Sequence, residues 1–153
     1  MLRKKFMKKK LVLISIIILV ILLSIIIKEK RLEVNDLNKE FLFGSNDYVL
    51  GGILISRMYY GPPGYGENTE TDSKEYPYIL QLNQPINIKA MKDDNMNVDV
   101  SNIYEVQLEM TKEQYNILKE YENKNIKLEG SFFSKLTGHH HTDVLFKVKK
   151  ILK

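Results

Sequence analysis

The chain has 153 residues, with 23 Lys and Arg, 19 Asp and Glu, a formal net charge of +4 and no cysteine. This length allows one ordinary domain, and the absence of cysteine excludes disulfide scaffolds, cysteine-ligated zinc fingers and thiol catalysis. A pI near 9.1 would normally indicate nucleic acid or an anionic membrane surface as a partner. That inference depends on where the charges lie along the chain.

The positive charge is concentrated at the N-terminus. Residues 1–10 hold six cations and no acid, and residues 11–27 consist only of Leu, Ile, Val and two Ser. As a helix, residues 11–27 would extend about 26 Å, close to the hydrocarbon thickness of a bilayer, so they predict a transmembrane helix. No small-x-small cleavage site follows, which favours an uncleaved signal anchor over the alternative of a cleaved signal peptide.

The flanking charges predict the orientation of this anchor. Six cations precede it and three closely follow it, so the positive-inside rule places residues 1–10 in the cytoplasm and the C-terminal domain outside it. The expected location is therefore the cell membrane, as a single-pass protein. Beyond Arg31 the chain holds 14 basic and 18 acidic residues, a net charge of −4. No nucleic-acid partner is expected, because a sequence-independent grip on phosphates needs an excess of Lys and Arg.

Residues 28–46 are polar and mixed, apart from the apolar cluster Phe41, Leu42 and Phe43. They predict a tether that docks onto the following domain through this cluster. The extracytoplasmic domain itself is expected over residues 47–153.

Five strands and one helix are predicted in this domain. The β-like stretches are Tyr48–Tyr60, Tyr76–Leu82, Ile103–Met110, Asn125–Lys135 and Asp143–Leu152. The second strand is expected to continue through Ile86 and Ile88 beyond a bulge. Thr111 is a natural N-cap, and Gln114 three residues later completes a capping box, so a helix is predicted between the third and fourth strands.

Alternation along the strands predicts which side chains are buried. The expected core positions are Tyr104, Val106, Leu108 and Met110 in the third strand, Ile126, Leu128 and Phe132 in the fourth, and Val144, Phe146 and Val148 in the fifth. The predicted fold class is mainly β (α+β). Three strands, a helix and two strands match the OB-fold, a five-stranded partly open barrel, and glycines within the first and fourth strands suit its curvature. An ordinary α+β sheet stays open as the alternative.

Two segments hold the unusual residues, and the first is residues 61–75. It begins Gly-Pro-Pro-Gly-Tyr-Gly-Glu and contains four carboxylates. Proline fixes φ and glycine permits positive φ, so this sequence predicts a shaped loop. The loop is longer than a hairpin requires, and such loops are often functional. A solvated hairpin connection is the plainer interpretation.

The second segment, residues 137–143, contains all three histidines of the chain. In an extended backbone His139, His141 and Asp143 point to the same side. Two imidazoles and a carboxylate are ligands for zinc or another divalent metal. Histidines at a turn also form hydrogen bonds with neighbouring backbone and carboxylates, so both interpretations stay open.

In an OB barrel the two segments would flank the ligand-binding face. They are therefore expected to form a two-loop rim, residues 61–75 and 137–143, that binds a polar ligand, a cation or a protein partner. The expected ligand-binding residues are Tyr65, Glu67, Asp72 and His140. A buried, hydrogen-bonded clasp between the loops is the structural alternative.

The same two segments resemble a known family. The resemblance rests on Tyr-Gly-Pro-Pro-Gly-Tyr-Gly-Glu at Tyr60–Glu67, on Thr71–Glu75 leading into Tyr78–Leu82, and on Thr-Gly-His-His-His-Thr-Asp-Val-Leu at Thr137–Leu145. Over about Tyr48–Leu152 the chain resembles the bacterial family known as domain of unknown function 4431, which consists of small exported proteins. The resemblance implies an exported or envelope-associated β domain with both loops as its signature, and it supplies no catalytic residue. The apparently uncleaved anchor departs from the soluble members.

Together these patterns predict a membrane-anchored extracytoplasmic binding module. Its expected partners are the membrane, through the N-terminal helix, and an unknown ligand or envelope protein. Two alternatives stay open: a metal-dependent hydrolytic enzyme that uses the histidines, and a purely structural envelope module. The sequence contains no nucleophile elbow, phosphate loop or dinucleotide fingerprint, so it offers little support for catalysis.

Overall fold

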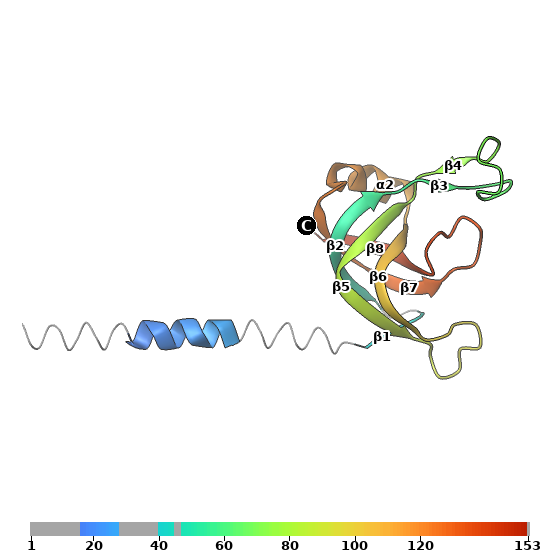
Figure 1. The fold of residues 1–153 in the computed structure, drawn as a ribbon. Coiled ribbons are helices and arrows are strands. Elements are labelled where there is room, and N and C mark those ends of the chain that lie inside the picture. Colours follow the sequence, from blue (N-terminus) through green and yellow to red (C-terminus); the bar gives the residue numbers. More distant parts are fainter. Residues whose placement is uncertain (1–15, 28–39, 45–46, 153) are drawn as a thin grey trace, which may run out of the picture. The chain divides into compact units, whose positions relative to one another are not determined.

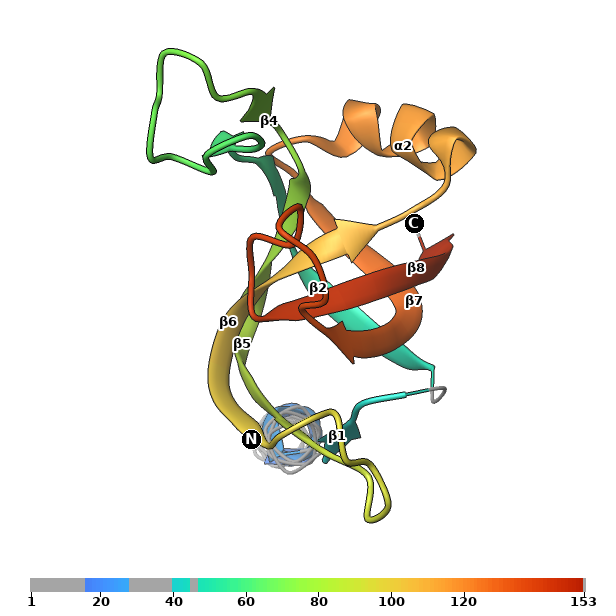
Figure 2. The same cartoon turned by 90° about the vertical axis from the view of Figure 1, so that its right-hand side faces the viewer.

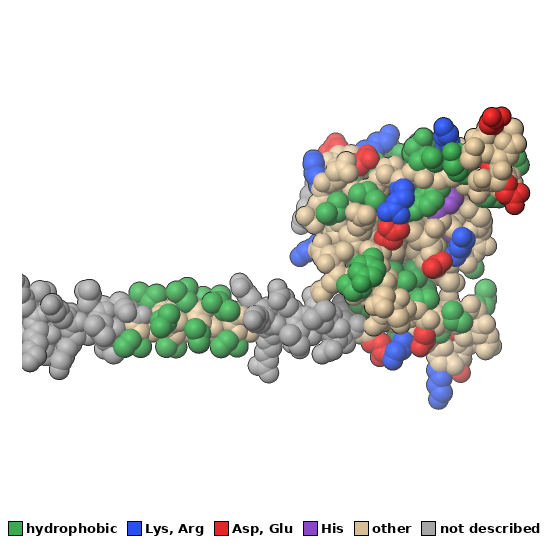
Figure 3. Space-filling view, viewed as in Figure 1, with side chains coloured by type: hydrophobic (Ala, Val, Ile, Leu, Met, Phe, Trp, Pro, Cys, Tyr) green, Lys and Arg blue, Asp and Glu red, His purple; other side chains and the backbone are tan. Residues whose placement is uncertain are grey.

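The computed structural model describes residues 16–27, 40–44 and 47–152 (Figure 1). Residues 16–27 form a helix with apolar side chains around its surface (Figure 3) and belong to a different unit from the domain that begins at Glu40. No helix within these described ranges is long and apolar enough to cross a membrane. The predicted cytoplasmic segment, the start of the predicted anchor and most of the predicted tether lie outside the described residues. The anchor and its orientation therefore stay predictions.

Five long strands form a closed barrel (Figures 1 and 2). They are β2 (Tyr48–Ser56), β5 (Tyr78–Lys89), β6 (Val100–Glu109), β7 (Asn125–Ser134) and β8 (Val144–Leu152). Around the barrel the order is β2, β5, β6, β8, β7 and back to β2. The β6–β8 pair is parallel and the other four pairs are antiparallel. The predicted mainly β class and five-stranded barrel are confirmed.

The predicted helix lies between the third and fourth barrel strands, as α2 (Lys112–Leu118) followed by the 3-10 turn η1 (Lys119–Tyr121). The Gln114 N–H donates to the Thr111 hydroxyl at 3.2 Å, and the Thr111 N–H donates to the Gln114 side-chain oxygen at 2.8 Å. The predicted capping box is therefore present. Leu118 is fully buried and attaches the helix to the barrel core.

The barrel interior is apolar, and most of its predicted core positions are confirmed. All the side chains that were predicted to be buried in the last two strands, β7 and β8, are buried: Ile126, Leu128, Phe132, Val144, Phe146 and Val148. In β6, Val106 and Leu108 are buried as predicted. Burying these large apolar side chains together removes their surface from water and supplies the main stabilisation of the domain.

Met110 is only partly buried against the core, and Tyr104 is the clear exception, because it is 62% exposed where alternation predicted burial. Ile103 and Val106 both pack against the core although they are three residues apart. The β5–β6 register also shifts between the pairs that contain Gln81 and Ile86. The inward side of β6 therefore changes within this stretch, and Tyr104 faces outward.

The predicted first strand is wrong at its end. β2 stops at Ser56, and β3 (Tyr59–Tyr60) forms a separate short ribbon with β4 (Lys74–Glu75). The continuation of the second strand is correct, because β5 runs on to Lys89 after the register shift. The β3–β4 ribbon carries residues of the candidate site described below.

The apolar cluster ahead of the barrel docks as predicted. β1 (Phe41–Leu42) pairs in parallel with the end of β5. Phe41 and Phe43 are buried, and the Phe41 ring contacts the edge of Phe132 with centroids 5.5 Å apart. The chain therefore enters the domain beside Ile88.

Candidate functional site

Two loops meet outside the barrel. The first loop, residues 61–73, joins β3 to β4, and the histidine loop, residues 135–143, joins β7 to β8. Figures 1 and 2 show them close together at one side of the domain. The ring of Tyr65 in the first loop faces the ring of His139 edge-on, with centroids 6.3 Å apart. The two segments that the sequence singled out are thus neighbours in space.

Glu75, on β4, connects the two sides of this site. Its Oε1 accepts a hydrogen bond from His139 Nδ1 at 2.6 Å, and its Oε2 accepts one from His141 Nε2 at 2.8 Å. Burial raises the pKa of Glu75, but hydrogen bonds from the two imidazoles lower it overall, so the carboxyl is ionised at neutral pH. An ionised carboxylate only accepts hydrogen bonds, so both ring nitrogens carry a proton. Glu75, His139 and His141 are called the clasp below.

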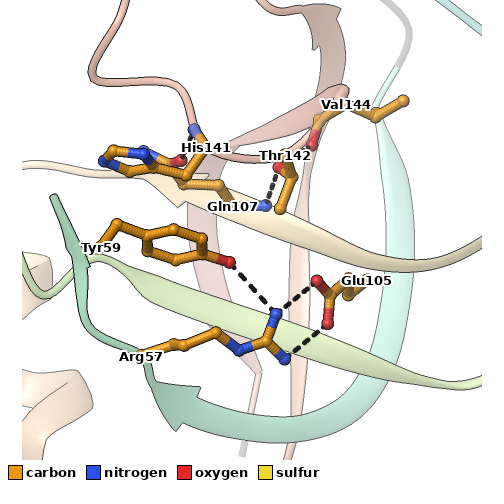
Figure 4. A network of polar contacts seen from close by, with 7 residues as sticks. All are labelled: Arg57, Tyr59, Glu105, Gln107, His141, Thr142 and Val144. Carbon is orange, nitrogen blue, oxygen red and sulfur yellow. Dashed lines mark hydrogen bonds and ion pairs between the residues drawn. The ribbon is translucent and has the colours of Figure 1, made fainter. Parts of the chain in front are cut away.

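His141 is the buried member of the clasp. Its side chain is 8% exposed, whereas that of His139 is 59% exposed. The His141 ring stacks on the Tyr59 ring with centroids 4.3 Å apart and planes 6° apart (Figure 4). Arg57 donates to the Tyr59 hydroxyl at 3.1 Å and forms a two-bond ion pair with Glu105 on β6. The stacked rings are therefore fixed to the barrel wall.

Gln107, on β6, holds the backbone of the histidine loop (Figure 4). Its Nε2 donates to the His139 carbonyl at 2.9 Å, and its Oε1 accepts from the His141 N–H at 2.6 Å. The Gln107 N–H donates to the Thr142 hydroxyl at 2.9 Å, and this hydroxyl donates to the Val144 carbonyl at 2.6 Å. Gln107 is itself only 8% exposed, so the histidine loop lies over the outer face of β6.

Asp72 organises the first loop. Its carboxylate accepts hydrogen bonds from the N–H groups of Gly64, Gly66 and Asn68 at 2.7, 2.8 and 3.2 Å. Burial raises the pKa of Asp72, and the three backbone donors lower it overall. Asp72 was predicted to bind a ligand, but both of its carboxylate oxygens are engaged in holding its own loop together.

Tyr65 stays 48% exposed and has a positive φ of 52°, which is uncommon for a residue with a side chain. Its ring lies directly against Gly138 of the histidine loop. A Cβ at Gly138 would approach the Tyr65 ring to 2.6 Å. Glycine at this position therefore allows the closest approach of the two loops.

The other two predicted ligand-binding residues, His140 and Glu67, differ in their contacts and exposure. The His140 Nδ1 accepts a hydrogen bond from the Leu136 N–H at 2.9 Å, and its ring contacts Phe133 edge-on. The pKa of His140 is lowered, mainly because burial disfavours the charged imidazolium, so the ring favours its neutral form. Glu67 is exposed. His140 thus supports the histidine loop from within.

The predicted metal ligands do not converge. His139 and His141 both face Glu75, while Asp143 is exposed and its carbonyl accepts a hydrogen bond from Lys135. In the part of the chain that the structure describes, no three His, Asp or Glu side chains are placed to hold a metal ion. The zinc site stays a prediction without support from this geometry.

A surface cavity of about 410 Å³ opens where the loops meet. Its walls are Met58, Tyr59, Tyr60, Tyr65, Lys135, Gly138 and His141. Among the residues predicted for ligand or metal binding, Tyr65 and His141 line it. Gly138 lies within the predicted rim segment 137–143, whereas the remaining walls were not predicted, because they were interpreted as the ends of barrel strands: Met58, Tyr59, Tyr60 and Lys135.

The comparisons with known proteins concern the C-terminal part of the domain. A family model described as Domain of unknown function (DUF4431) matches residues 105–152. This segment includes Glu105, Gln107 and the histidine loop, whereas Tyr59, Glu75 and the first loop lie outside it. No curated protein and no solved structure was found to match the chain. The resemblance predicted over about Tyr48–Leu152 is therefore confirmed over residues 105–152, which contain the histidine loop but not the first loop.

Proposed function

We propose that the protein is a membrane-anchored, extracytoplasmic binding module that receives a polar ligand between its two loops. The cavity lined by Tyr59, Tyr65 and Lys135 carries this proposal, because it opens where the two unusual segments of the sequence meet. The anchor and its orientation rest on residues 11–27 and the charges around them.

The strand order supports an OB-like assignment of the barrel. Taking β2, β5, β6, β7 and β8 as strands one to five, α2 lies between strands three and four. OB-folds bind ligands on the face of strands two and three and at the loops after strands one and four. These positions correspond here to β5, β6, the first loop and the histidine loop, so the cavity lies where ligands of this fold are expected.

The walls of the cavity are held in place before any ligand arrives. Tyr59 is stacked on His141, Gln107 fixes the histidine loop, and Asp72 fixes the first loop. Fixed walls reduce the entropy that must be lost on binding. Nothing comparable favours the hydrolytic alternative, because Glu75 already engages both histidines of the clasp.

Binding at this cavity predicts that Tyr65→Ala abolishes ligand recognition while Glu67→Ala preserves it. Tyr65 lines the cavity, and Glu67 is an exposed residue of the same loop that does not. The full-length protein in detergent is screened by thermal shift against sugars, amino acids, short peptides and metal ions. Compounds that raise the melting temperature are expected to lose their effect in Tyr65→Ala only. A screen without any Tyr65-dependent compound would leave the structural envelope module as the better explanation.

The orientation predicts opposite labelling of two single-cysteine variants. The chain has no cysteine of its own, so Glu70→Cys and Met7→Cys each introduce one thiol. In intact cells without an outer membrane, a membrane-impermeant maleimide is expected to label Glu70→Cys at once and Met7→Cys only after lysis. Labelling in the reverse order would place the domain in the cytoplasm, and labelling of both in intact cells would exclude the anchor.

A further inference from the structure

The cavity combines aromatic rings with one positive charge. Three of its seven lining residues are tyrosines, and no carboxylate lines it. Lys135 makes no ion pair among the contacts of the described residues. The carboxylate of Glu75 is held by two imidazoles, so it does not neutralise Lys135. Lys135 is exposed at the cavity wall, so a ligand with an anionic group could pair with it.

The rings of Tyr59 and Tyr65 both contact neighbouring side chains. Tyr59 is locked between the His141 ring and the Arg57 guanidinium. Tyr65 keeps a positive φ, a conformation that costs energy in a residue with a side chain and persists only where surrounding contacts impose it. The three backbone hydrogen bonds to Asp72 impose it here. Conformations of this kind cluster at binding sites.

Flat, fixed tyrosine rings are suited to the C–H face of a sugar ring. A tyrosine ring offers apolar contact area, and its hydroxyl offers a hydrogen-bond partner at the edge of the ring. The cavity volume of about 410 Å³ lies near the lower end of the range of about 300–1,000 Å³ for small-molecule sites. It therefore suits one or two sugar units rather than a long stretch of polymer.

We infer that the cavity binds a saccharide unit that carries a carboxylate or a phosphate. The sugar face lies on Tyr65 or Tyr59, and the acidic group pairs with Lys135. This inference rests on the proposed function and adds the class of ligand to it. Lys135 would repel a cationic ligand. The chain beyond Arg31 has a net charge of −4, which would repel nucleic acid. A sugar with an acidic group can stack on the aromatic walls and pair with Lys135 at the same time.

The test measures dissociation constants of the full-length protein in detergent for glucose, glucuronic acid, glucose 1-phosphate and inorganic phosphate. Glucuronic acid or glucose 1-phosphate is expected to bind at least tenfold more tightly than glucose and than phosphate alone. Comparing the two acidic sugars distinguishes a carboxylate from a phosphate ligand. The preference over glucose is expected to weaken as salt is raised, because salt screens an exposed ion pair.

Two lysine variants test the role of the charge. Lys135→Gln is expected to lower the affinity for the acidic sugar at least tenfold and so to remove its preference over glucose. Lys74→Gln removes an equal charge from β4 outside the cavity walls and is expected to retain the preference. Equal affinity of the wild type for glucose and both acidic sugars would overturn the role of Lys135, and equal affinity for phosphate alone would overturn the role of the sugar.

Failure of the ligand class is separable from failure of the binding site. If no sugar binds but another compound shows Tyr65-dependent stabilisation, the saccharide inference is wrong and the binding module stands. If no compound shows Tyr65-dependent stabilisation, the proposed function itself fails. Tyr65→Ala must also abolish sugar binding, because a sugar bound equally by this variant lies elsewhere on the protein.

Discussion

Replacing Gln107 by leucine is expected to lower the free energy of unfolding by about 2–3 kcal/mol and to release the histidine loop from the barrel. Leucine has a similar volume but cannot bond the His139 carbonyl or the His141 N–H. Leaving such partly buried backbone groups without partners costs about 1–3 kcal/mol each, less where water reaches them. Urea denaturation measures the stability, and amide hydrogen exchange at His141 measures the release of the loop.

The same substitution at Gln81 is the matched control. Gln81 is an exposed residue on β5, two residues beyond the position that pairs with Gln107. Gln81→Leu is expected to change stability by less than about 0.5 kcal/mol, as exposed substitutions usually do. Equal effects of the two variants would show that the loss at Gln107 comes from removing a polar side chain from β6 or β5, and not from the histidine loop.

The barrel was predictable because its strands carry a local signal. Alternating apolar residues in β7 and β8 identified both the strands and their buried side chains, and the capping box at Thr111 identified the helix between β6 and β7. The alternation failed at Tyr104, where the β5–β6 register shifts and the inward side of the strand changes. The sequence predicted a bulge before Ile86 in the partner strand, but which side of β6 faces inward depends on how the two strands pair, and the sequence of β6 alone does not reveal this.

The site was predictable only at the level of whole loops. The first loop and the histidine loop were both singled out, and the structure brings them together. Residues 61–75 contain several carboxylates with the same local appearance, however, and their roles differ. Asp72 holds its own backbone, Glu67 is exposed, and Glu75 joins the histidines. Nothing in the local sequence distinguishes these roles, because they depend on which partner the fold brings near.

The clasp has one half inside the family match and one half outside it. His139 and His141 lie within residues 105–152, while Glu75 and the stacking Tyr59 come from the β3–β4 ribbon. The cavity likewise takes Lys135 from one part and Tyr65 from the other. A chain that retained only the matched segment would lack both the carboxylate and most of the aromatic walls. The binding proposal therefore concerns the complete two-loop arrangement rather than the matched segment alone.

Replacing Glu75 by glutamine is expected to destabilise the domain by about 2 kcal/mol near neutral pH. The carboxylate accepts two hydrogen bonds, and bonds to a charged group are worth about 1.5–3 kcal/mol. The glutamine amide accepts through one atom only and presents N–H groups to the second imidazole. Urea denaturation of the variant and the wild type measures the difference.

This difference is expected to depend on pH in a defined direction. The pKa of Glu75 is lowered in the folded domain from its ordinary value of 4.5. Between the folded pKa and 4.5 the unfolded chain therefore holds a proton that the native chain lacks, and stability rises with pH. The contribution of Glu75 is complete above about pH 4.5 and is lost as the pH falls through the folded value. The wild type and Glu75→Gln should converge in stability as the pH falls below the folded pKa of Glu75.

Glu70→Gln is the matched control, because Glu70 is an exposed carboxylate of the first loop without a hydrogen bond to a histidine among the described residues. It is expected to follow the wild type across the whole pH range. A gap between the wild type and Glu75→Gln that stays constant as the pH falls from neutral to the acid unfolding of the domain would mean that the carboxylate charge does not hold the clasp. The clasp would then act through shape alone, and Tyr59 stacking on His141 would have to hold the two loops together.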